Sequence, residues 1–446
     1  MQLPEGPSTP RWLQKVQWTT DPLTYLDVAG QRYGDIFNAP VIGSDPTLLL
    51  VSHPEALQQI FVNENKAFTA PPNQLMQPIV GDYSVFFLDG DRHRRERKLL
   101  MPPFHGDRMR AYGQLICDLS EKVSSQIPPG TCFTARTMAQ AISMEVILTA
   151  VFGLYEGARF QQLKQLIVSL VDAFQSPFIS GLLFFPSLRK DWGARSPWGY
   201  FRHLQRQIDQ LLYAEISDRR QQNDSSRSDI LSLLLAARDE IGHVMTDAAL
   251  RDELMTLLLA GHETTATAIA WALYWIHRLP TVGATLRQEL DALGKSPEPM
   301  DIFQLPYLTA VCHETLRIYP VAILTVPRAV IQPVKLMDYW LKPGTRLYGC
   351  IYLTHHREDL YPNSKQFQPE RFLERQFSPY EFLPFGGGMR RCIGEALALF
   401  EMKLVLATIL SRYQLALTEQ KPEYPQRRGI TLGPGRGVKM QMQGHR

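Results

Sequence analysis

The chain has 446 residues, of which 45% are hydrophobic and 20% charged, and its formal net charge is +3. A chain of this length and composition can bury a large core, which excludes a disordered tail, a collagen, a mini-scaffold and a coiled-coil rod. A charge this close to neutral gives no argument for nucleic acid as a partner.

The N-terminal segment lacks the pattern of a signal peptide, because Pro4, Pro7 and Pro10 stand where an apolar run is needed. Further along, residues 173–188 form a long uncharged stretch. It is shorter than the ~20 residues of a membrane span, and two prolines interrupt it. We therefore expect a cytoplasmic protein with no transmembrane anchor, while peripheral contact with a membrane surface stays open.

The cysteines give a second indication of the compartment. Their number is odd and no two form a C-x-x-C pair, so neither a disulfide framework nor a zinc ribbon is expected. The simple interpretation is five reduced thiols of a cytosolic protein: Cys117, Cys132, Cys312, Cys350 and Cys392.

Helical and strand-like patterns follow one another along the chain. A strand-like segment at 46–51 comes first, and apolar residues then recur every three or four positions at 115–124, 137–152, 159–174, 199–221 and 229–239. Further strand-like segments lie at 329–336, 345–353 and 438–442. The polar connectors are short. The pattern predicts a single, mostly helical α+β domain over residues 1–446, with a small sheet assembled from distant segments.

One predicted helix is far longer than the others. It can begin with Thr246 as N-cap and must end before Pro280, which gives roughly 32 residues, or about 48 Å at ~1.5 Å per residue. Along its central part the only ionisable side chains are His262 and Glu263, directly after Gly261. Such groups are costly in a buried helix unless they are partnered. We expect either a solvated kink or a local opening that handles a proton or a ligand.

Two familiar motifs are incomplete in this chain. The H-E-x-x-H zinc motif would need a second histidine where Ala266 stands. The GPGRGV run at Gly433 has Val438 in place of the third glycine of a dinucleotide-binding fingerprint, and no G-K-[ST] phosphate loop occurs. The sequence therefore supports neither a zinc protease nor a nucleotide-binding protein.

The segment 385–394, FGGGMRRCIG, carries the strongest chemical signal. Its glycines let the backbone approach something flat and bulky. Cys392 precedes a predicted helix, whose N-terminus favours a thiolate, and Arg390 and Arg391 add positive charge. Such a thiolate is a nucleophile or a soft metal ligand. A nucleophile needs a base, and no histidine lies close in sequence. A metal needs further ligands, four of which a haem supplies itself.

Five of these residues match the haem-binding signature F-x-x-G-x-R-x-C-x-G, so the chain resembles the cytochrome P-450 monooxygenases: Phe385, Gly388, Arg390, Cys392 and Gly394. Further motifs agree with this family in order and spacing, namely H-x-x-x-R at 93–97, A-G-x-E-T-T at 260–265, E-x-x-R at 314–317 and F-x-P-E-R-F at 367–372. The pattern is most similar to the soluble cyanobacterial relatives of the retinoic acid hydroxylases.

This resemblance implies a cytochrome P-450 fold, a large helical domain with a long distal helix and a small β-rich N-terminal subdomain. It also implies haem b (iron protoporphyrin IX), with Cys392 as the axial ligand of the iron. Its other implied cofactor contacts are Phe385, Gly388, Gly394, Ala260 and Gly261, with His93, Arg97, Arg328 and Arg390 at the propionates. Glu263 and Thr264 are implied to handle protons, and a buried triad is implied for Glu314, Arg317 and Arg371.

The resemblance also indicates what the protein acts on. The implied substrate contacts are Val321, Ala322, Leu324, Ile430 and Thr431. The implied pocket segments are largely apolar, which favours a long hydrophobic substrate, such as retinoic acid or another retinoid or terpenoid. A fatty acid or a sterol stays open. Electrons must come from a separate ferredoxin or flavodoxin with its reductase, because no flavin or iron–sulfur motif occurs in the sequence. The alternatives are a haem-thiolate peroxygenase or isomerase and a non-catalytic haem-dependent ligand-binding protein.

Overall fold

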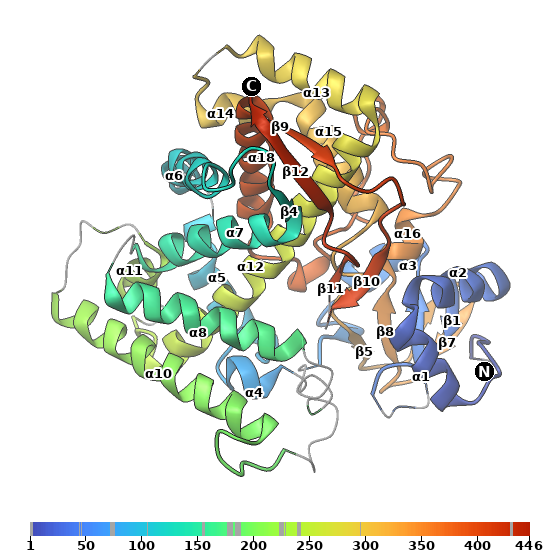
Figure 1. The fold of residues 1–446 in the computed structure, drawn as a ribbon. Helices are drawn as coiled ribbons and strands as arrows, with labels where there is room; N and C mark the ends of the chain where they lie inside the picture. Colours follow the sequence, from blue (N-terminus) through green and yellow to red (C-terminus); the bar gives the residue numbers. More distant parts are fainter. Residues whose placement is uncertain are drawn as a thin grey trace. The chain divides into compact units, whose positions relative to one another are not determined.

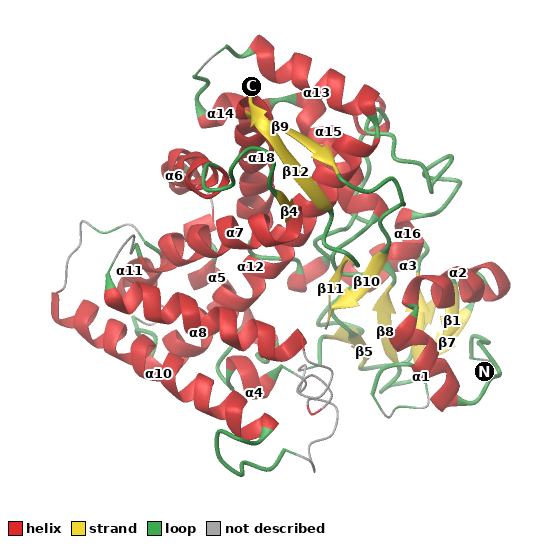
Figure 2. Cartoon of the chain, in the orientation of Figure 1, coloured by secondary structure: helices red, strands yellow, loops and turns green. Residues whose placement is uncertain are grey.

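The computed structural model describes residues 3–43, 45, 47–71, 76–104, 106–153, 157–175, 182, 189–222, 227, 229–238, 242–294, 296–428 and 431–446. Helices dominate and the strands are short (Figure 2). The chain separates into two compact units. Unit 1 comprises Met1–Pro71, Ser120–Ala139 and Ala266–Arg446, and unit 2 comprises Pro72–Leu119 and Gln140–Thr265. The prediction of a single domain over the whole chain stays a prediction.

The main sheet of unit 1 joins segments that are far apart in the sequence. Its strand order is β1 (Ile36–Asn38), β2 (Leu48–Val51), β8 (Arg346–Gly349), β5 (Arg328–Val330) and β3 (Phe68–Thr69). Strands β2 and β8 are parallel, and the other neighbours are antiparallel. A small sheet of distant pieces is therefore confirmed.

Strand β2 shows why this sheet forms. Leu48 and Leu50 pack in one hydrophobic cluster with residues of α1 (Arg11–Thr20) and α2 (Pro22–Tyr33). Leu49 and Val51 pack in another, with residues of α3 (Pro54–Val62). Alternate side chains of a strand point to opposite faces, so an uninterrupted apolar run indicates a strand buried on both sides. All four residues are fully buried, which fits that explanation.

Two predicted strands were wrong in extent. The segment 329–336 forms two strands, β5 and β6 (Val334–Leu336), separated by a bend, and β6 pairs with β7 (Tyr339–Leu341). The segment 345–353 leaves the sheet after Gly349 and becomes helix α16 (Ile351–His355). The β-branched and aromatic residues here suited either structure, and the short helix buries Ile351 and Tyr352.

The C-terminal part of unit 1 contributes further helices and small sheets. Several of its helices begin with proline, which suits the first helical position. The helices that begin in this way are α13 (Pro280–Ala292), α14 (Pro299–Gln304) and α15 (Pro306–Ile318). They are followed by α17 (Arg371–Glu374) and α18 (Glu395–Arg412). Small sheets form from β4 (Cys132–Thr134), β12 (Lys439–His445) and β9 (Tyr413–Leu417), and from β10 (Pro425–Arg428) and β11 (Thr431–Pro434).

Unit 2 is built mainly of helices. They include α4 (Gln77–Val80), α5 (Gly90–Leu100), α8 (Ala158–Gln175), α10 (Pro197–Gln222) and α11 (Ile230–Ala236), with parts of α6 (Asp107–Ser124) and α7 (Ala135–Phe152). Helices α8 and α10 lie side by side (Figure 1). The predicted helices at 115–124, 137–152, 159–174 and 199–221 are confirmed, and the one predicted at 229–239 ends at Ala236.

The long predicted helix is α12 (Asp247–Arg278), and its 32 residues confirm the predicted length. Thr246 caps it, since the Ala249 amide donates to Thr246 Oγ1 at 3.2 Å. The helix is unbroken through Gly261, and the Thr264 hydroxyl donates back to the Ala260 carbonyl at 2.7 Å. The polar residues therefore cause no break in the helix. None of the helices within the described parts of the chain is long and apolar enough to cross a membrane.

Candidate active site

The cysteine loop, defined here as residues 385–394, is a closed turn that directly precedes α18 in the chain. The Cys392 amide donates to the Phe385 carbonyl at 3.0 Å, and the Arg391 amide donates to the Gly388 carbonyl at 3.1 Å. Gly388 has φ +66°. This is the left-handed region that favours glycine, so the loop needs glycine at this position for its shape.

Cys392 differs in its surroundings from the buried thiols of unit 1. Cys312 and Cys350 are fully buried, and burial raises the pKa of each to about 12. Cys392 is exposed and lies three residues before the first residue of α18. The pKa of Arg391 is raised, chiefly by its hydrogen bond to Glu395 and also by the charge of Cys392. Two buried thiols are therefore kept neutral, while Cys392 has a cation and a helix N-terminus beside it.

The cysteine loop fits a flat group with a metal at its centre. A Cβ atom built on Gly394 would have only Cys392 Sγ within 4 Å, at 4.0 Å, so the space beside the sulfur is open on that side. A single exposed thiolate is a soft ligand of the kind that holds haem iron. The chemistry of this donor and the open approach to it are both compatible with haem.

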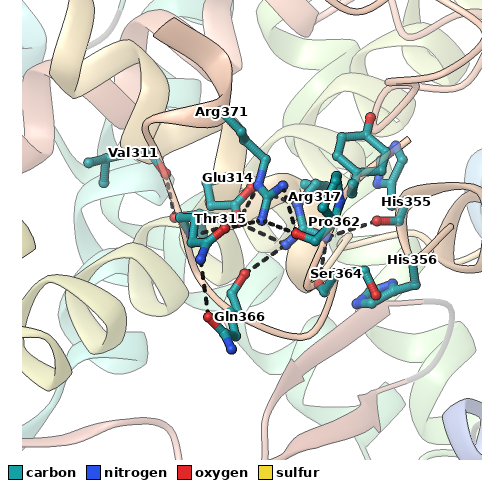
Figure 3. Close-up of polar contacts among 12 residues, drawn as sticks. Val311, Glu314, Thr315, Arg317, His355, His356, Pro362, Ser364, Gln366 and Arg371 are labelled. Carbon is teal, nitrogen blue, oxygen red and sulfur yellow. Dashed lines mark hydrogen bonds and ion pairs between the residues drawn. The ribbon is translucent and has the colours of Figure 1, made fainter. Parts of the chain in front are cut away.

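The structure brings together the three members of the predicted triad (Figure 3). Arg317 donates to Glu314 twice, from Nε to Oε2 at 2.6 Å and from Nη2 to Oε1 at 2.8 Å. Arg371 Nε donates to Glu314 Oε1 at 3.2 Å. The side chains of Glu314 and Arg317 are 0% exposed and that of Arg371 is 9% exposed. Two guanidinium groups thus share one buried carboxylate.

His355 connects the triad with the cysteine loop. Arg317 Nη1 donates to the His355 carbonyl at 2.8 Å, and His355 Nε2 accepts from the Leu383 amide at 3.0 Å. Burial, with the nearby Arg317 charge, lowers the pKa of His355 to about 3, so its ring is neutral and can accept. The Leu383 carbonyl in turn accepts from the Gly386 amide at 2.9 Å. Sequence reasoning missed His355, because an isolated histidine gives no signal before the fold places it.

The two predicted propionate partners of unit 1 have different surroundings. Arg390 lies at the end of the short helix Gly388–Arg390 and donates to the Ala70 carbonyl at 3.4 Å. Arg328 is buried, and each of its three guanidinium nitrogens donates to the protein itself: to the Glu64 carboxylate, the Val326 carbonyl and the Gly387 carbonyl. Arg328 therefore contacts the cysteine loop directly.

The predicted site residues of unit 2 lie on α5 and α12. His93 is buried and Arg97 partly buried, one turn apart on α5, so they share a helix face. Glu263 Oε2 accepts from Gln140 Nε2 at 2.7 Å. A Cβ atom on Gly261 would lie 2.9 Å from Ile147 Cδ1. Glycine at this position therefore allows α7 to pack closely against α12.

Three side chains near the start of α12 bind the segment 83–85, which precedes α5 in unit 2. Asp252 Oδ2 accepts from the Tyr83 amide at 2.9 Å, and Glu253 Oε1 accepts from the Val85 amide at 2.7 Å. Thr256 donates to the Ser84 hydroxyl at 2.7 Å. Burial raises the pKa of Glu253 well above its usual value. No motif indicated these contacts, because the two segments are about 170 positions apart.

The predicted substrate residues of unit 1 fall into two groups. The Val321 carbonyl accepts from the Leu432 amide at 2.8 Å, which places segment 321–324 beside β11. Ala322 and Leu324 pack against the two hydrophobic clusters of the main sheet, so they also serve the core. The Thr431 hydroxyl donates to a backbone carbonyl, and Ile430 lies outside the described residues.

A model of the cytochrome P450 family matches residues 4–439. The chain therefore belongs to the cytochrome P450 family, whose members are monooxygenases that bind haem b. Among curated proteins it is similar to the one named "Putative cytochrome P450 135B1" of Mycobacterium tuberculosis, with 35% identity over 100% of this chain and 92% of the relative. A second mycobacterial relative, named "Putative cytochrome P450 135A1", is 32% identical over 99% of this chain and 95% of the relative.

Two solved structures have the same fold. One is a cyanobacterial CYP120A1 with bound retinoic acid, at a TM-score of 0.85 and 24% identity, covering 99% of this chain and 100% of that chain. The other is the haem domain of cytochrome P450DA, at a TM-score of 0.85 and 21% identity, covering 100% of this chain and 98% of that chain. The predicted fold class is thereby confirmed, and so are the enzyme class and the haem b cofactor.

Proposed function

We propose that this cytochrome P450 hydroxylates a long hydrophobic molecule and that the Cys392 thiolate would hold its haem iron. The observation that carries the proposal is the exposed Cys392 at the start of α18, in a loop held from behind by buried contacts. When bound, a thiolate-ligated haem supplies oxygen activation, since thiolate donation favours O–O cleavage. The test is the carbon monoxide difference spectrum of the reduced protein, which should show the thiolate-type Soret band and lose it in Cys392→Ser.

We propose that the remaining contacts to the haem come from residues of the cysteine loop, of α5 and of α12. Phe385, Gly388 and Gly394 would border the haem from the cysteine loop, and Ala260 and Gly261 would do so from α12. His93, Arg97 and Arg390 would bind the propionates, because charged hydrogen bonds to carboxylates are strong. The same role was expected for Arg328, whose nitrogens all have protein partners in this structure.

Thr264 and Glu263 would handle protons. The Thr264 hydroxyl donates to the Ala260 carbonyl at 2.7 Å, which leaves its oxygen lone pairs available to hold a water molecule. Glu263 is only partly buried and is oriented by Gln140, so its carboxylate can exchange protons with solvent and pass them on.

Replacing Thr264 tests this assignment. Thr264→Ala should raise the ratio of released peroxide to hydroxylated product, because water is no longer held in place. The backbone keeps its helical hydrogen bonds, so stability should change by less than about 1 kcal/mol. Peroxide and product are measured together against NADPH consumption. Unchanged coupling would remove Thr264 from the mechanism.

The proposed substrate is retinoic acid or another retinoid or terpenoid. Two arguments support it: the implied pocket segments are apolar, and a protein of the same fold has been solved with bound retinoic acid. A panel of retinoids, terpenoids, fatty acids and sterols should be titrated by the shift of the Soret band and then assayed for product by mass spectrometry. Binding of fatty acids or sterols alone would reassign the substrate. Product formed only with peroxide would favour the peroxygenase, and binding without any product would favour the ligand-binding protein.

We propose that electrons come from an acidic ferredoxin or flavodoxin served by its own reductase. Four cations on α5 are exposed and would attract such a partner: Arg92, Arg94, Arg95 and Lys98. Raising the salt concentration shortens the range of this attraction. Turnover with a ferredoxin should therefore fall as ionic strength rises, while peroxide-driven turnover should not. Turnover that is insensitive to salt would exclude electrostatic docking.

A further inference from the structure

A buried carboxylate lies directly behind the cysteine loop. Glu64 follows α3, and its Oε2 accepts from the Met389 amide at 2.6 Å, while Oε1 accepts from Arg328 Nε. The side chains of Glu64 and Arg328 are only 5% and 2% exposed. No sequence motif indicated Glu64, which is more than 300 positions before the loop that it contacts.

The glycines of the loop are shaped around this carboxylate and its neighbour. A Cβ atom on Gly388 would lie 2.4 Å from Glu64 Oε1, and one on Gly387 would lie 2.4 Å from a ring carbon of Phe61. Neither distance is compatible with a side chain, so both glycines are needed for the loop to lie against α3 and the turn after it. Glycine at these two positions is thus explained by the packing of Glu64 and Phe61 against the loop.

Arg328 holds the same loop from a second direction. Its Nη2 donates to the Gly387 carbonyl at 3.0 Å, and its guanidinium lies over the Phe61 ring, 5.4 Å from the centroid. Glu64 and Arg328 together therefore bind two consecutive peptide groups, through the Gly387 carbonyl of the first and the Met389 amide of the second. A charged pair that is buried and hydrogen-bonded to backbone fixes geometry, whatever its net contribution to stability.

We propose that Glu64 is a positioning residue for Cys392, and that Arg328 acts with it on the cysteine loop. Met389 is three residues before Cys392, and the short helix Gly388–Arg390 connects the clamped backbone to the cysteine. When the backbone of Gly387 and Met389 is fixed, the Cys392 sulfur is held in the position from which it would bind the iron. This inference rests on the proposed role of Cys392 as the iron ligand.

The test compares Glu64→Ala and Glu64→Gln with a matched control, Glu395→Gln. Glu395 is also an acidic neighbour of the cysteine loop, but it binds the exposed Arg391 side chain and no loop backbone. Carbon monoxide spectra of the reduced holoenzymes give the fraction of haem with the thiolate-type Soret band. We expect this fraction to fall relative to other haem forms by about tenfold in Glu64→Ala, the effect of losing the one charged hydrogen bond that Glu64 makes to the loop backbone. Glu64→Gln keeps the shape and one acceptor, so it should be intermediate, and Glu395→Gln should match the parent protein.

A second measurement applies if a Glu64 variant folds but does not bind haem. In the haem-free chain, alkylation of Cys392 is followed by peptide mass spectrometry, with the exposed Cys132 as internal standard. The Cys392 rate should rise relative to Cys132 in both Glu64 variants. A thiolate-type fraction and a relative alkylation rate equal to those of the parent protein would overturn the proposal. Retention of the thiolate-type band in Cys392→Ser would overturn the role of Cys392 instead, so the two failures can be told apart.

Discussion

Two buried clusters of charged side chains, one in each compact unit, have opposite arrangements. In unit 1 the Glu314 carboxylate is shared by Arg317 and Arg371. In unit 2 one guanidinium, that of Arg219, is shared by two carboxylates, with Nε donating to Glu215 at 2.8 Å and Nη1 to Asp229 at 2.9 Å. Both clusters are almost fully removed from solvent. Burial of charge alone therefore does not distinguish them.

The two clusters differ in the groups outside the cluster that their side chains bind. Arg317 donates to the carbonyl of His355, the last residue of α16, and to those of Ser364 and Gln366, in the segment with little regular structure that leads to the cysteine loop. Arg219 binds the end of α7 and the Ser232 hydroxyl of α11, and Asp229 caps α11. Irregular backbone depends on side chains for its hydrogen bonds, whereas helices supply most of their own. Breaking the first cluster should therefore disturb the cofactor, and breaking the second should lower stability alone.

The largest effect is expected from Glu314→Gln. The variant leaves two buried guanidinium groups without their carboxylate, at a cost of about 3–5 kcal/mol. Because the segment behind the cysteine loop loses its support, we expect haem incorporation to be abolished, and Arg317→Ala should give the same result. The haem-to-protein ratio of the purified variants measures this. A fully haem-loaded Glu314→Gln protein would show that the triad does not support the cofactor site.

The matched change in the other cluster is Arg219→Met. It removes the shared cation, but Arg159 still binds Glu215 at 2.6 Å and Arg227 still binds Asp229 at 3.3 Å. The free energy of unfolding should therefore fall by about 3 kcal/mol, the lower end of the range for a broken buried pair. Urea unfolding gives this value, and the haem content of the folded fraction should stay at the parent level. A loss of haem equal to that of Glu314→Gln would erase the difference between the clusters.

A smaller effect should appear on acidification, through His355, which binds to the Glu314 cluster. The pKa of His355 is lowered from 6.5 to about 3, so the folded state binds fewer protons than the unfolded state below pH 6.5. The stability that its neutral ring provides is complete above 6.5 and is lost as the pH falls toward 3, by about 1.4 kcal/mol per pH unit. The partners described for Arg219 include no histidine. His355→Gln should flatten the dependence of unfolding free energy on pH between 7 and 5, and Arg219→Met should leave it unchanged.

The same comparison shows what could be predicted from the sequence. Glu314 and Arg317 are three positions apart on a helix and match a family motif, so the triad was predictable once the family was recognised. Glu215 and Arg219 are four positions apart on α10, and Asp229 is ten positions further on, but these residues match no motif, and charged residues in a polar run are usually solvated. Glu64 and His355 were missed for the same reason. The cysteine loop and α12 were predictable because their signals are local, whereas their supporting contacts are long-range.

The smallest effect is expected where a charged pair of the cysteine loop is open to solvent. Arg391 donates from Nε to Glu395 at 2.6 Å, one turn apart, with side chains that are 46% and 24% exposed. Exposed pairs at this spacing contribute about 0.3–0.5 kcal/mol and weaken in salt. Glu395→Gln should therefore lower the thermal midpoint slightly at low ionic strength and scarcely at high ionic strength. A double-mutant cycle with Arg391→Gln isolates the pair. A coupling energy as large as that of the triad would mean that proximity to the loop, and not burial, makes a charge pair matter here.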